Sequence, residues 1–204
     1  MITTFRTIFL AASVLLTGCT TVVISSSRAP AMAEPLTSAT VLYVGATLGD
    51  RSATPSLGTV LGTIQGIPLG ASGSRVTEDA RALGEHVLKQ LPAALRTAGL
   101  TVEVEPMQIA TLVTTPDGYA SLFGPAAKSP VFVIRPVSAR MECPGACFVF
   151  RLQVQLLDAD YSTQLWSGVF DTPPRASRYH DFSDPAMNFT KTFIGQLRND
   201  NVIK

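Results

Sequence analysis

Apolar and polar residues follow one another with the period of strands in some segments of the chain and of helices in others. In residues 148–158 every second side chain from Phe150 to Leu156 is apolar, while Arg151 and Gln153 stand between them. Such alternation is typical of an antiparallel strand with one buried face. Runs of β-favouring residues predict four further strands, at 40–44, 100–105, 131–134 and 164–170.

Two segments instead repeat apolar residues every three or four positions, which predicts helices. The first runs from Val76 to Ala98 and ends at Gly99, a residue suited to a left-handed cap; Pro92 is expected to kink or break it. The second begins at Asp184. Because each element has one apolar face, we expect an α+β fold: a two-layer sandwich with a mostly antiparallel sheet and two main helices on one face.

The amino-terminal segment has the layout of a secretory signal. Arg6 precedes an apolar run of about ten residues, which is too short to span a bilayer, since that needs roughly 20 residues. The motif Leu16-Thr17-Gly18-Cys19 follows and resembles the lipobox of bacterial lipoproteins. The resemblance implies a signal peptide at 1–18 and a covalent lipid, with palmitate among its chains, on Cys19; a buried first helix of a cytosolic protein is the alternative.

The residue after the cysteine is Thr20 rather than aspartate. By the same resemblance, this favours anchoring in the outer membrane, facing the periplasm, over the inner membrane. Residues 19–38 are rich in Ser, Thr, Ala and Pro and are interpreted as the lipid anchor and a flexible tether. Residues 39–204 then form a single periplasmic domain.

Residues 45–74 form a glycine-rich insertion in which Gly58, Gly62 and Gly66 recur at every fourth position. Glycines at this spacing share one helix face and allow close approach, although Pro68 interrupts the run. The segment is either a long loop or a contact surface for a partner, a sister subunit or lipid.

Cys143 and Cys147 flank Pro-Gly-Ala between two predicted strands. In an oxidising compartment this predicts a disulfide at the tip of a hairpin. Free thiols and redox or metal chemistry are the alternatives; the spacing is not Cys-x-x-Cys, and no further Cys or His pair completes a zinc site.

The remaining composition limits the function further. The formal charge of +1 gives no electrostatic footprint for nucleic acid, and the sequence holds no nucleophile elbow or metalloprotease motif, so we expect no enzyme, no metal and no cofactor besides the lipid on Cys19. The loop at 172–182 gathers four side chains suited to an anionic partner or to a solvated loop: Arg175, Arg178, Tyr179 and His180.

The segments Leu156–Asp160 and Gln164–Gly168, with a closing helix, are similar to those of small Gram-negative envelope lipoproteins: penicillin-binding-protein activators, auxiliary lipoproteins of ABC-type transport, and the TolB amino-terminal-domain type. The resemblance implies a non-enzymatic binding or accessory component for another envelope protein or polymer. The alternatives are a subunit of a self-assembling envelope complex, using segment 57–70, and an auxiliary lipoprotein of ABC-type lipid transport.

Overall fold

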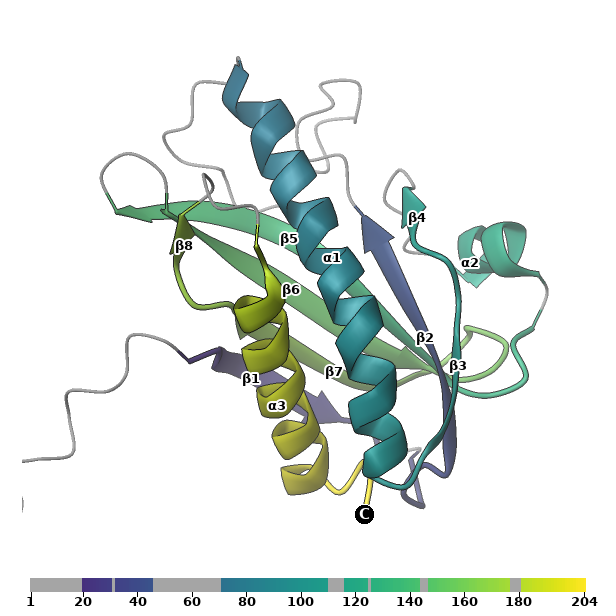
Figure 1. Ribbon diagram of the computed structural model, residues 1–204. Helices are drawn as coiled ribbons and strands as arrows, with labels where there is room; N and C mark the ends of the chain where they lie inside the picture. Colours follow the sequence, from purple (N-terminus) through teal and green to yellow (C-terminus); the bar gives the residue numbers. More distant parts are fainter. Residues whose placement is uncertain are drawn as a thin grey trace, which may run out of the picture.

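The computed structural model describes residues 20–30, 32–45, 71–109, 116–124, 126–143, 147–176 and 181–204. Figure 1 shows a sheet with two long helices lying side by side across one face. The elements in chain order are β1 (Val22–Arg28), β2 (Ser38–Gly45), α1 (Ala71–Thr97), β3 (Thr101–Val104), β4 (Gln108–Ile109), α2 (Pro116–Phe123), β5 (Val131–Cys143), β6 (Cys147–Leu157), β7 (Gln164–Asp171), β8 (Arg175–Ala176) and α3 (Ser183–Asn199).

The sheet is mixed. Its strand order is β1-β7-β6-β5-β2-β3, with β4 beside β2 and β8 beside β6. Neighbours from β1 to β5 are antiparallel, whereas β2 pairs in parallel with β5, β3 and β4. The predicted α+β class is therefore confirmed. The predicted antiparallel pairing holds only for the half of the sheet from β1 to β5, because β2 pairs with its neighbours in parallel. The reason is that β2 and β3 are joined through α1, and a crossover of this kind returns the chain in the same direction.

The main core lies between the sheet and the helices α1 and α3. The predicted apolar stripes of both helices are buried, as are Phe150, Leu152, Val154 and Leu156 of β6. Aromatic rings dominate the contact between α3 and the sheet: Phe193 stacks on Phe189 at 5.7 Å between ring centroids and meets Phe170 edge to face at 5.8 Å. The prediction of two main helices on one face is thus confirmed (Figure 1).

Helix α1 is longer than predicted, and Pro92 lies inside it without breaking it. A proline removes one backbone hydrogen bond, and the buried residues on both sides of Pro92, notably Leu91 and Leu95, hold the helix against the core. The cap at Gly99 is as predicted: its φ is +94°, its N–H donates to Arg96 O at 2.9 Å, and Leu100 N donates to Leu95 O at 3.1 Å.

Helix α2 covers one end of the opposite face of the sheet. Its Tyr119 packs in a second, smaller core with Leu42, Val133 and Tyr161, and the Tyr119 and Tyr161 rings lie 5.8 Å apart. Pro116, Asp117 and Gly118 are residue types common in turns, but here they lie inside this helix. Gln108 and Ile109 pair with β2 as strand β4.

The predicted flexible tether is wrong for residues 22–28, which form the edge strand β1. Val22 pairs with Asp171 and Arg28 with Trp166, while Ser27 Oγ lies 3.0 Å from Ser167 Oγ. The Ser and Pro content of the segment suggested a linker, but Val22-Val23-Ile24 has high β-propensity and β7 offers an unpaired edge. Among the described helices, none is long and apolar enough to cross a membrane.

Candidate functional site

The face of the sheet turned away from α1 and α3 is only partly covered, by α2 at one end. Since Leu152, Val154 and Leu156 enter the main core, the intervening residues of β6 point to this other face. There Gln155 Nε2 donates to Gln164 Oε1 at 2.8 Å, beside the Ser27–Ser167 hydroxyl pair, and both contacts are exposed. We name Ser27, Gln153, Gln155, Gln164 and Ser167 the open face.

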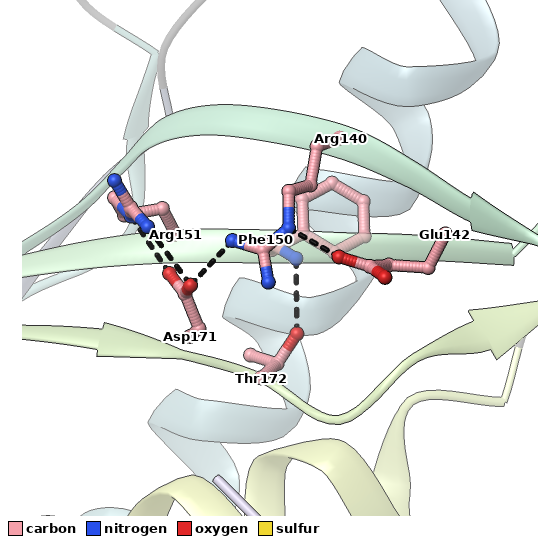
Figure 2. A network of polar contacts seen from close by, with 6 residues as sticks. All are labelled: Arg140, Glu142, Phe150, Arg151, Asp171 and Thr172. Carbon is pink, nitrogen blue, oxygen red and sulfur yellow. Dashed lines mark hydrogen bonds and ion pairs between the residues drawn. The ribbon is translucent and has the colours of Figure 1, made fainter. Parts of the chain in front are cut away.

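Next to the open face, two arginines converge on one buried carboxylate (Figure 2). Arg151 and Asp171 are register partners on β6 and β7, and Arg151 binds Asp171 with two contacts, Nε to Oδ1 at 2.7 Å and Nη2 to Oδ2 at 2.9 Å. Arg140 of β5 adds Nη1 to Oδ2 at 2.5 Å and also pairs with Glu142. We name these four residues the arginine–aspartate cluster; it ties β5, β6 and β7 together.

The cluster has no net charge, because two cations face two carboxylates. Burial alone would raise the pKa of Asp171, whose side chain is 5% exposed, but the hydrogen bonds from Arg151 and Arg140 outweigh burial and hold the pKa below its usual range. Thr172 follows at once and accepts a hydrogen bond from Phe150 N at 3.0 Å (Figure 2). Asp171 therefore remains ionised near neutral pH and acts as a structural anchor.

A shallow cleft of about 260 Å³ lies between this cluster and the beginning of β1. Its lining combines charged and hydroxyl side chains with aliphatic side chains and prolines. Its lining residues are Thr20, Val22, Ile24, Arg140, Glu142, Val149, Asp171, Thr172, Pro173 and Pro174. We name it the β1 cleft.

Arg135 forms a second polar contact on the same face of the sheet as the open face, near α2. It is 7% exposed and donates from Nε and Nη2 to Gln153 Oε1, at 3.1 and 2.8 Å. Burial lowers the pKa of its guanidinium and also raises the pKa of the nearby Tyr119 hydroxyl. The contact between Arg135 and Gln153 therefore links β5 and β6 beside Tyr119 of α2.

The structure brings the two predicted disulfide residues together. Cys143 and Cys147 are register partners at the end of the β5–β6 hairpin. This agrees with the predicted hairpin staple, and the covalent bond itself stays a prediction.

Most other predicted site residues lie outside the described part of the chain. These are the signal segment with Cys19, the glycines Gly58, Gly62 and Gly66, and Arg178, Tyr179 and His180. Arg175 lies in β8, where its backbone pairs with Phe148 of β6.

Sequence reasoning missed the arginine–aspartate cluster and the β1 cleft. The alternation of β6 did place Arg151 on the outer face, which was the available signal. Its partnership with Asp171 depends on the register between β6 and β7, and the cleft depends on β1 being a strand at all.

No family model matches the chain, and no curated protein does. Among solved structures, similarity extends over most of the fold. A PelC dodecamer from Paraburkholderia phytofirmans is 16% identical, covers 87% of this chain and 96% of its own, and gives a TM-score of 0.40. The lipoprotein GNA1162 from Neisseria meningitidis is 15% identical, covers 79% of this chain and 99% of its own, and gives a TM-score of 0.36. The neighbours thus include a bacterial lipoprotein, at a similarity too low to define a family.

Proposed function

We propose that this protein is a non-enzymatic lipoprotein, anchored in the outer membrane by acyl chains on Cys19 and facing the periplasm. Its α+β domain acts as a binding or accessory component for another envelope protein or polymer. The observation that carries the proposal is the open face, a part of the sheet where exposed amide and hydroxyl side chains pair with one another across β1, β6 and β7.

The chemistry of the open face suits recognition of a surface. Glutamine and serine side chains both donate and accept hydrogen bonds, so they can exchange their contacts with each other for contacts with a partner. Gln155 and Gln164 lie on the adjacent strands β6 and β7, which keeps their amides at a fixed spacing. A rigid sheet therefore presents a row of hydrogen-bonding groups at little entropic cost.

The size of the β1 cleft also favours surface contact over enclosure of a small molecule. Pockets that enclose small molecules commonly have volumes of about 300–1,000 Å³, whereas this cleft measures about 260 Å³ and is shallow. The β1 cleft itself therefore fits contact with a surface better than enclosure of a lipid chain.

A pull-down from chemically cross-linked envelopes tests the proposal. The baits are the full-length acylated protein, a Cys19→Ala variant, an open-face variant (Gln155→Arg with Ser167→Arg), and a helix control (Arg81→Ala with Glu85→Ala) from the exposed side of α1. We expect one envelope component to be captured by the wild type and the helix control and lost with the other two baits. If the open-face variant captures the component as well as the wild type does, the open face is not the binding surface. Recovery of only the protein itself supports the self-assembling alternative.

A further inference from the structure

We propose that the β1 cleft and the exposed beginning of β1, at Val22 and Ile24, rest directly on the lipid surface, so that the domain is held against the membrane in one orientation. The inference builds on the proposed acylation of Cys19 and adds the face that the anchor presents to lipid. The β1 cleft contacts the interfacial region of the bilayer, where acyl chains meet headgroups.

The first step is the length of chain between the anchor and the fold. Only Thr20 and Thr21 separate Cys19 from β1. Thr21 is already buried, and Val22 is paired with Asp171. Three Cα–Cα steps join Cys19 to Val22, and a fully extended chain covers at most about 11 Å in three steps. A lipid on Cys19 therefore keeps the beginning of β1 within about 11 Å of the anchored cysteine.

The second step is the apolar surface at that point. In the described part of the chain, four large apolar side chains are exposed, and two of them, Val22 at 51% and Ile24 at 48%, lie within five residues of Cys19. The other two are remote: Val104 lies on β3, at the opposite edge of the sheet, and Met187 lies on α3. Exposed aliphatic side chains gain free energy by entering the interface in proportion to the area they bury.

The third step concerns the charged residues that line the cleft. The Arg140 side chain is 50% exposed, so its guanidinium can reach lipid phosphates while remaining bonded to Asp171. Arg140, Arg151, Asp171 and Glu142 together carry no net charge. The contact therefore depends on apolar burial, and we expect it to be the same on zwitterionic and on anionic bilayers.

Tryptophan fluorescence can test this orientation, because the chain has a single tryptophan, Trp166, which is fully buried. The acylated full-length protein is reconstituted in phosphatidylcholine vesicles containing brominated lipids, which quench tryptophans that lie at the interface. Ile24→Trp is compared with Val104→Trp and Met187→Trp, which place the same reporter at the two remote exposed sites. All three replace exposed side chains, and circular dichroism checks that each variant folds.

We expect bromolipid to quench Ile24→Trp several-fold more than either control, with little change when phosphatidylglycerol is added. Equal quenching at all three positions overturns the proposal. Protection of Ile24→Trp from quenching in a stable dimer also overturns it, because β1 then contacts a second copy of the chain. Mass spectrometry and vesicle flotation of the same samples, with Cys19→Ala as control, show separately whether the protein is acylated and anchored. If the protein is acylated and floats with the vesicles but shows no selective quenching, the proposed orientation is wrong while the proposed lipid anchor stands.

Discussion

The ring of Tyr43 lies directly against Gly84, so that a Cβ atom built at position 84 would collide with Tyr43 Cε1. Tyr43 belongs to β2 and Gly84 to α1, and the Tyr43 hydroxyl donates to Ala80 O at 3.0 Å. Burial raises the pKa of this hydroxyl far above its usual range. It therefore stays protonated and keeps donating, which fixes the helix on the sheet through one ring and one hydrogen bond.

Replacing Gly84 with alanine is expected to destabilise the protein. In a helix interior, alanine is favoured over glycine by about 1 kcal/mol. Here the added methyl collides with a buried ring that also holds a hydrogen bond, and overpacking of this kind costs typically 1–3 kcal/mol. We expect a net loss of up to about 2 kcal/mol in the free energy of unfolding, measured by urea denaturation.

Gly195→Ala is the matched control. Gly195 also lies inside a long helix, α3, but a Cβ atom there meets nothing within 4 Å. The helix-propensity gain is then unopposed, and we expect this variant to be more stable by about 0.5–1 kcal/mol. If both variants gain stability alike, the contact between Tyr43 and Gly84 is not tight.

Asp171→Asn is predicted to weaken the junction of β5, β6 and β7. The change removes the charge that Arg140 and Arg151 share and leaves two guanidinium groups facing an amide. A hydrogen bond to a charged group contributes about 1.5–3 kcal/mol to stability. We therefore expect a loss of about 2 kcal/mol in the free energy of unfolding. Glu85→Gln, in the exposed Arg81–Glu85 pair on α1, is expected to change it by less than about 0.5 kcal/mol. Similar values for the two variants would contradict a special role for Asp171.

The helices and the main core could be predicted from the sequence because each depends on a local pattern. The spacing of Phe189, Phe193 and Leu197 defines one helix face regardless of its partner. In the same way, the alternation from Phe150 to Leu156 defines a buried strand face. The left-handed cap at Gly99 followed from the chemistry of one residue.

The strand β1 and the arginine–aspartate cluster could not be predicted in this way, because both depend on pairing between distant segments. Ser25, Ser26 and Ser27 suit a linker as well as a strand, and only the free edge of β7 decides between them. Arg140, Arg151 and Asp171 come together through the registers of β5 with β6 and of β6 with β7, including the shift near Pro136. A shift by one residue would turn these side chains to the opposite face.

Stability is predicted to fall in acid because three aspartates, Asp158, Asp171 and Asp200, have lowered pKa values in the folded protein. Burial opposes ionisation of Asp200, but hydrogen bonds from Trp166, Ser26 and Gln196 outweigh it; for Asp171 the arginines have the same effect. The unfolded chain, with Asp pKa values of about 3.9, then binds more protons than the folded one below about pH 5. The stabilisation is present above that pH and is lost as the pH falls through about 4 and below.

Chemical denaturation between pH 7 and pH 3 measures this dependence. Asp171→Asn and Asp200→Asn are each expected to flatten the fall in the free energy of unfolding, since each removes one of the groups that must be protonated. Trp166→Phe, which removes the 2.8 Å hydrogen bond from Nε1 to Asp200 Oδ2, should flatten it partly. An acid profile that is the same in the wild type and in both asparagine variants would place the titrating groups elsewhere.

Cys143 and Cys147 are predicted to form a disulfide when the protein is produced in an oxidising compartment. They are register partners at the end of the hairpin, and strand partners place Cα atoms about 4.5–5.5 Å apart, which lies within the range that a disulfide spans. The closed loop is short, so the bond should add only about 2 kcal/mol to the free energy of unfolding.

Intact mass after alkylation without reduction should therefore show neither cysteine modified, and reduction should lower the urea midpoint modestly. The double variant Cys143→Ser with Cys147→Ser should reproduce the reduced midpoint and no longer respond to reductant. Alkylation of both thiols in protein exported to the periplasm would show instead that the hairpin is held by its backbone pairing alone.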